Sequence, residues 1–207
     1  MKMASAESLL ALGDSEGALN ALNRLGAPPR IQACVKLANA KYGEAVALFD
    51  QMGDRPAAIA AALLEPWEQY SSWQAVDSPE LQPVVEAVLA KRLLDRSAVD
   101  AIQGHIPPEA APYVDIPRKI AEYNVWCVSR VAESVSLATL QRVISAVGDF
   151  DIESLIPFLA ERFGCRVDQV DDIIEFSSSD EATRQTDHLD ALFEKVEQLR
   201  SEGTKPC

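Results

Sequence analysis

The sequence is poor in the residues that metal sites and catalytic sites use most. Its 207 residues include only two histidines and four cysteines, and no two cysteines stand in a Cys-x-x-Cys pair. Neither histidine has a Cys or His at metal-ligand spacing, so we expect no structural zinc. Scattered cysteines are typical of reduced thiols in an intracellular protein. The sequence therefore predicts no bound metal and no cofactor.

Long apolar runs are also missing. The longest unbroken one, Ala57–Leu64, has eight residues, whereas a membrane-spanning helix needs about 20. The first residues, Met1–Glu7, contain no apolar region of the kind found in signal peptides. We therefore expect a cytoplasmic protein that does not contact a membrane.

Basic residues are few. The chain has 32 Asp and Glu against 19 Lys and Arg, which gives a formal charge of −13. Much of this excess lies in residues 151–207, which contain 14 acids and 6 bases. Proteins that bind nucleic acids need clustered Lys and Arg to neutralise phosphates. Direct recognition of nucleic acid is therefore not expected.

Sequence motifs of catalysis are absent as well. The chain has no Gly-x-x-x-x-Gly-Lys phosphate loop and no Gly-x-Gly-x-x-Gly segment after a predicted strand. His188 is expected on the polar face of the last helix, and His105 in a loop beside Pro107. We expect Cys127 to be a small core residue, because apolar surroundings raise the pKa of a thiol. No catalytic residue is predicted, and the protein is not expected to be an enzyme.

The residues that are plentiful indicate a mostly α-helical fold. Hydrophobic residues make up 48% of the chain, and most are spaced three or four apart, with Ala and Leu dominant. Residues 1–132 are expected to form a helical body. Its predicted helices are 15–25, 30–40, 41–52, 55–64, 80–94, 97–104 and 116–131.

Two segments of this body are similar to each other. Leu12–Leu19 and Ala40–Ala47 both look like second helices of tetratricopeptide-type hairpins, about 27 residues apart, whereas the usual repeat is about 34. We therefore expect an irregular helical-repeat array of tetratricopeptide or HEAT type. Ordinary Ala-rich helices are the alternative.

Residues 133–178 begin with two predicted helices. Ser136 can cap the first, over residues 137–147. The second ends at Gly164. Because proline breaks a helix interior, Pro157 requires this second helix to begin late, near Ser154, or to be kinked.

Two short segments, Cys165–Val167 and Asp172–Phe176, follow these helices across an acidic turn. They are either a β-hairpin or one more turn of helix. Helix, turn, helix and hairpin is the order of elements in a winged helix. The second helix has a negative net charge, so we expect this winged helix to bind protein and not DNA.

The end of the chain, residues 179–207, is expected to be a polar linker and a C-terminal helix. The helix, Asp187–Ser201, has one apolar stripe whose spacing suits the seam of a helix bundle. The stripe packs either on its own chain or on a partner. It consists of Leu189, Leu192, Phe193, Val196 and Leu199.

Several short segments resemble a known family. They are Val147–Phe150, Ser154–Leu155, Arg162–Cys165 and Ile173–Ser177, in a chain with a helical body, an acidic winged helix and a terminal helix. In these features the sequence resembles the PCI family. Members of that family are scaffold subunits of eukaryotic initiation factor three, the COP9 signalosome and the proteasome lid.

The resemblance implies a non-catalytic scaffold subunit. Family members join through winged-helix edges and C-terminal helices, so Ile174 and Phe176 are expected to contact a partner together with the apolar stripe. The implied partner is another PCI-domain subunit, with subunit l of the initiation factor expected first and the small ribosomal subunit contacted indirectly. A signalosome or lid subunit is the alternative within the same fold. A free adaptor is the other alternative, binding peptides through Trp67, Tyr70 and Trp73.

Overall fold

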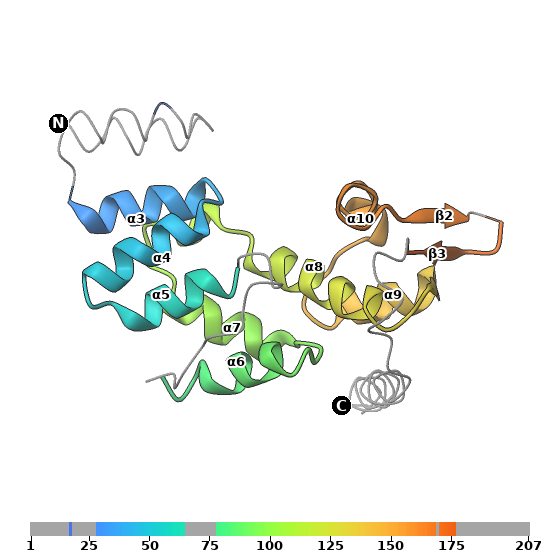
Figure 1. Ribbon diagram of the computed structural model, residues 1–207, viewed down its shortest axis with the longest axis horizontal. Helices are drawn as coiled ribbons and strands as arrows, with labels where there is room; N and C mark the ends of the chain where they lie inside the picture. The colour runs from blue at the N-terminus through green and yellow to red at the C-terminus, as the bar shows by residue number, and fades with distance from the viewer. Residues whose placement is uncertain (1–16, 18–27, 65–77, 169, 177–207) are drawn as a thin grey trace. The chain divides into compact units, whose positions relative to one another are not determined.

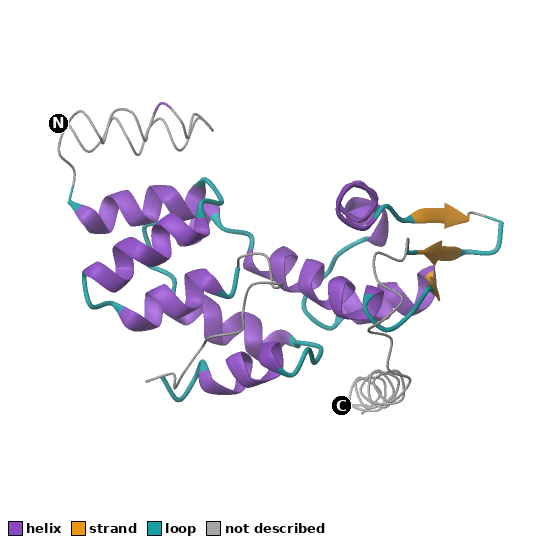
Figure 2. Cartoon of the chain, viewed as in Figure 1, coloured by secondary structure: helices purple, strands orange, loops and turns teal. Residues whose placement is uncertain are grey.

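The computed structural model describes residues 17, 28–64, 78–168 and 170–176. These residues form α-helices and one small antiparallel sheet (Figures 1 and 2), which confirms the expected mostly α class with a small β element. None of the described helices is long and apolar enough to cross a membrane. The chain divides into two compact units, Met1–Glu86 with Asp100–Ile116 and Ala87–Val99 with Pro117–Cys207. The expected segments, residues 1–132, 133–178 and 179–207, stay a prediction.

The first unit contains three consecutive helices, in which α4 packs on both α3 and α5. Their bounds are α3 Pro29–Ala38, α4 Tyr42–Gln51 and α5 Arg55–Ala62. Phe49 of α4 and Leu37 of α3 are fully buried, and so is most of the alanine-rich α5. Because alanine side chains are small, they allow the helix backbones to pack close together in this core. The first of the two similar segments lies, apart from Gly17, outside the described residues, and a repeat array stays a prediction.

The turn between α4 and α5 uses a glycine in the left-handed region. Gly53 has φ +73°. This conformation is unfavourable for any L-amino acid that has a Cβ atom. Asp54 then caps α5 by accepting a hydrogen bond from the Ala57 N–H at 3.4 Å. The sequence predicted this break between the two helices.

Two glycines of this unit allow a matched test of backbone conformation. A Cβ added at Gly53 or at Gly104 would meet nothing within 4 Å, so the substitutions differ only in the backbone. We expect Gly53→Ala to lower the free energy of unfolding by about 1 kcal/mol. Gly104→Ala, inside a helix, should raise it by about 0.5–1 kcal/mol. Urea denaturation measures both changes in the free energy of unfolding. Equal effects of the two substitutions would contradict the left-handed conformation of Gly53.

The predicted helix over 80–94 is too long, and the observed α6 covers Gln82–Leu89. Lys91 adopts φ +51°, and the Arg92 N–H donates to the Ala87 carbonyl at 2.8 Å, which ends the helix as a left-handed C-cap does. Helix α7 follows at Arg96–His105, where Asp95 caps it by accepting from the Ser97 N–H at 3.0 Å. His105 was expected in a loop, and this was wrong, because the helix continues to it. A short 3-10 helix, η2 Ala111–Tyr113, comes next.

The second unit contains the long helix α8 and the small sheet. The elements in chain order are α8 Ile116–Ser129, β1 Ser134–Ser136, α9 Leu137–Ser145, η3 Ile152–Leu155, α10 Ile156–Phe163, β2 Arg166–Asp168 and β3 Ile173–Glu175. Ser136 caps α9 by accepting from the Thr139 N–H at 3.2 Å, as predicted. Pro157 stands in the first turn of α10, after the 3-10 turn η3, which confirms the late start of this helix. Gly164 ends α10 with φ +58°.

The hairpin alternative is confirmed for the segment after α10. Strand β2 pairs with β3 antiparallel, with Val167 opposite Ile174. The sequence did not predict β1, which pairs with the other side of β3 and gives the sheet order β1-β3-β2. Strand β3 is therefore central. Its Ile174 is buried, and so are Leu140 and Ile144 of α9 and Leu155 of η3.

Candidate partner-binding site

The outer edge of β2 is the part of the sheet most suited to pairing with another chain. Two hydrogen bonds, both 2.8 Å long, lie at the two ends of the β1–β3 pairing. The Leu137 N–H donates to the Asp172 carbonyl, and the Phe176 N–H donates to the Glu133 carbonyl. Hydrogen-bonded pairs alternate in an antiparallel ladder, so the backbone of Ile174 also faces β1.

The same alternation fixes the direction of the backbone groups of β2. The residues on either side of Ile174 must face β2, and their partners in the register are Asp168 and Arg166. The N–H and C=O of Val167, between these two, therefore point away from β3. Within the described part of the chain, no strand lies on that side of β2. An unpaired edge of this kind is a template for an added strand.

Two of the predicted contact residues lie in the interior of the unit. Ile174 has 0% and Phe176 6% of its surface exposed. These side chains serve the core of their own chain, so a partner at this sheet would meet β2 instead. The remaining five predicted contacts, the apolar stripe of the C-terminal helix, lie outside the described residues, as do Trp67, Tyr70 and Trp73.

The tip of the hairpin is held by Asp168. Its Oδ1 accepts hydrogen bonds from the N–H groups of Val170, at 2.9 Å, and Asp171, at 3.2 Å. These backbone donors lower the pKa of the Asp168 carboxyl, because they stabilise its charged form. The tip needs no glycine, since Asp172 takes the positive φ of +53°. Val170 is left 92% exposed, and Asp168, Asp171 and Asp172 are close to it in the sequence.

Because the pKa of Asp168 is lowered, we expect the hydrogen bonds at the tip of the hairpin to depend on pH. A carboxyl with a depressed folded pKa contributes stability that is present above its ordinary value of 3.8 and is lost as the pH falls through the folded value. We expect the amide resonances of Val170 and Asp171 to shift with a midpoint below pH 3.8 in an NMR titration. Asp168→Asn should abolish this titration, and a midpoint at or above 3.8 would contradict the capping role.

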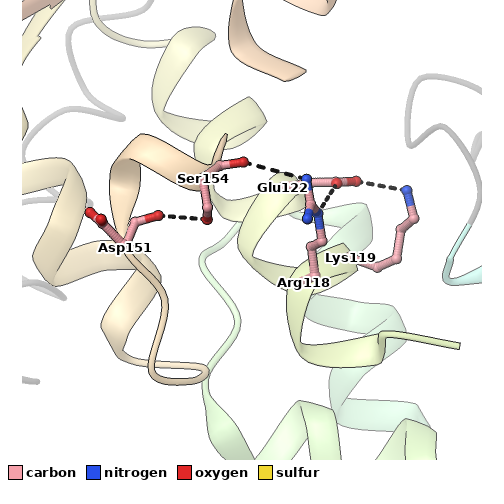
Figure 3. Close-up of polar contacts among 5 residues, drawn as sticks. All are labelled: Arg118, Lys119, Glu122, Asp151 and Ser154. Carbon is pink, nitrogen blue, oxygen red and sulfur yellow. Dashed lines mark hydrogen bonds and ion pairs between the residues drawn. The ribbon is translucent and has the colours of Figure 1, made fainter. Parts of the chain in front are cut away.

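A charged cluster joins α8 to η3, the turn before α10 (Figure 3). Glu122 is only 4% exposed and accepts from Arg118 Nε at 3.3 Å and Lys119 Nζ at 2.7 Å. Arg118 also donates to the Ser154 carbonyl at 3.5 Å, and the Ser154 hydroxyl donates to the Asp151 carbonyl at 2.7 Å. The buried carboxylate is thus paired with two cations from its own helix, and one of them reaches the turn before α10. This pattern fits a structural link.

A serine, a histidine and a glutamate also meet in the first unit. Ser78 Oγ lies 3.2 Å and Glu80 Oε2 3.3 Å from the same atom, His105 Nε2, while His105 Nδ1 lies 3.0 Å from the Ala101 carbonyl. In a hydrolytic triad the acid and the serine bind opposite nitrogens of the imidazole. Here they share one nitrogen, and Ser78 is buried. The arrangement fits a link between the segment before α6 and the end of α7, and no sequence motif indicated it.

Two of the described cysteines, Cys34 and Cys127, are buried. Burial raises the pKa of Cys34 to about 11 and that of Cys127 to about 12, which confirms Cys127 as a core residue. Thiolate, the reactive form, is therefore scarce at both near neutral pH. Among the described residues, no group of three His, Cys, Asp or Glu side chains could hold a metal ion.

Comparison with known proteins gives no assignment. No family model matches the chain, and a search of curated proteins also finds no match.

Proposed function

We propose that this chain is a non-catalytic scaffold subunit of a multi-protein complex, of the PCI type and most similar to subunit k of eukaryotic initiation factor three. In that role it acts in translation initiation at the small ribosomal subunit, in the cytoplasm. It contacts other PCI-domain subunits, with subunit l as the first expected partner. A corresponding subunit of the COP9 signalosome or the proteasome lid is the alternative.

The observation that carries the proposal is the outer edge of β2 at the end of a sheet with the order β1-β3-β2. One strand, two helical segments and a two-stranded hairpin in chain order, with the last strand central, is the arrangement of a winged helix. The outward N–H and C=O of Val167 are the groups that a partner strand would pair with. The helical first unit supports a scaffold role in a more general way.

The charge of the hairpin supports a protein partner. Asp168, Asp171, Asp172 and Glu175 lie on β2, β3 and the tip between them, against one base, Arg166. Such a surface repels phosphate backbones and attracts a basic protein surface. The expected apolar stripe of the C-terminal helix would add hydrophobic burial, at about 25 cal/mol per Å² before ordering costs.

A pull-down of the tagged full chain from a eukaryotic extract, with mass spectrometry of the bound proteins, tests the proposal. We expect initiation factor subunits and small-subunit ribosomal proteins to be recovered. Val167→Pro removes the outward N–H while sparing the bonds to β3, and it should reduce recovery about tenfold. Val167→Thr keeps this N–H and a β-branched side chain, and it should bind as the parent does.

Substitutions in the C-terminal helix test the second expected contact. Leu192→Asp and Phe193→Asp place charge in the apolar stripe and should also release the partners. Recovery of signalosome or lid subunits would keep the fold and change the complex. A chain that recovers no PCI-domain subunit, although folded by circular dichroism, would contradict the scaffold proposal.

A further inference from the structure

We propose that a second copy of this chain pairs with the outer edge of β2, which gives a two-fold symmetric dimer with one continuous sheet. The inference depends on the sheet and on the charges of β2 and does not depend on the proposed function. It concerns the state of the chain when no other subunit occupies this edge.

The backbone of β2 suits a two-fold axis through Val167. Its N–H and C=O both point away from β3, as the register with Asp168 and Arg166 requires. In an antiparallel pair centred on this residue, each Val167 N–H donates to the Val167 carbonyl of the second copy. One residue therefore supplies both a donor and an acceptor to the same residue of its partner, as an isologous interface demands.

The charges of β2 are complementary to themselves in this register. Arg166 and Asp168 stand one on each side of Val167 and project to the same face of the sheet. Around the two-fold axis, Arg166 of each copy comes opposite Asp168 of the other. Opposite charges across neighbouring strands are stabilising, whereas like charges directly opposite are destabilising. A parallel pair would place Arg166 opposite Arg166, so the charges select the antiparallel arrangement.

The cross-strand pairs act against the net charge of the chain. In the antiparallel dimer, each Arg166 attracts Asp168 of the other copy. This local attraction opposes the general repulsion between two chains of formal charge −13, which is screened beyond about 8 Å at physiological salt.

The dimer is expected to be weak, because β2 has only three residues and an interface of this kind buries little area. Self-pairing and pairing with another subunit would use the same groups of Val167, so the two exclude each other. The dimer would therefore cover the exposed edge of the unassembled chain, an edge that otherwise invites aggregation.

Sedimentation velocity of the full chain, over a hundredfold range of concentration at about 0.15 M salt, tests the inference. We expect a reversible shift from a species of 22.5 kDa toward twice that mass. Arg166→Glu makes both cross-strand pairs repulsive and should weaken dimerisation at least about tenfold. Arg142→Glu, an equal charge change at an exposed position of α9, should leave it unchanged. Val167→Pro should abolish it.

A mixing experiment separates the specific register from a general charge effect. Asp168→Arg should also be monomeric, whereas an equimolar mixture of Arg166→Glu and Asp168→Arg chains restores opposite charges and should dimerise. A parent chain that stays monomeric over the whole concentration range would overturn the inference, whether its own C-terminal segment covers β2 or not. A dimer that survives both Val167→Pro and Arg166→Glu would do the same. If Asp168→Arg does not fold, the Arg166, Arg142 and Val167 variants decide the question.

Discussion

Replacing Asn124 with leucine should lower the free energy of unfolding by about 3 kcal/mol. Asn124 lies on α8 with 1% of its surface exposed. Its Nδ2 donates to the Leu94 carbonyl at 2.7 Å, and its Oδ1 accepts from the Leu94 N–H at 2.8 Å. Leucine has the same number and branching of side-chain heavy atoms but leaves both backbone groups buried and unsatisfied, each at a cost of about 1–3 kcal/mol. The midpoint of urea denaturation, with its slope, measures this loss.

A neighbouring residue provides the control for Asn124→Leu. The hydroxyl of Tyr123 donates to the Arg92 carbonyl at 3.1 Å, in the same connection between α6 and α7. Tyr123→Phe removes the bond to the Arg92 carbonyl and keeps the ring, so it should cost only about 1 kcal/mol. Asn124→Asp buries a carboxylate and places one of its oxygens against the Leu94 carbonyl, so it should cost about as much as Asn124→Leu. A change below about 1 kcal/mol for Asn124→Leu would show that Asn124 does not fix this connection.

The second large effect is expected in the first unit, where Phe49→Ala should cost about 4 kcal/mol. Phe49 is completely buried on α4, which packs on α3 and α5. Truncation removes the ring and leaves a cavity that rigid helices fill only in part. Met52, at the end of the same helix, is 36% exposed, and Met52→Ala should cost less than about 1 kcal/mol.

Thermal or urea unfolding monitored by circular dichroism checks this second prediction. Because the chain divides into two units, Phe49→Ala and Asn124→Leu report on different ones. If the chain unfolds in one cooperative transition, both substitutions should shift it. If it unfolds in two, each should move its own phase, and a variant that shifts only the other phase would contradict the division.

The candidate site was only partly predictable from the sequence. The two segments of the hairpin were identified, but strand and helix could not be distinguished, because three residues are too few to display a period of 2 or of 3.6. Ile174 and Phe176 were identified as apolar, but alternation along a strand does not say which face is the core. Strand β3 is central because it also pairs with β1, and that pairing joins residues about 40 positions apart.

The sequence by itself determined the elements whose cause is local. Apolar spacing placed most helices to within a few residues, the side chain of Ser136 began α9, the ring of Pro157 delayed α10, and Gly53 and Gly164 supplied left-handed turns. Each of these effects acts within one or two turns of the chain.

Tertiary structure alone decided the features that depend on distant partners. Helix α6 ends early in a connection that Asn124 holds from 30 residues away, and His105 meets Ser78 across 27 residues. The open edge of β2 exists because β1 and β2 flank the same central strand. Hydrogen bonds and burial at such separations depend on how the whole unit packs, and no local pattern of residues encodes them.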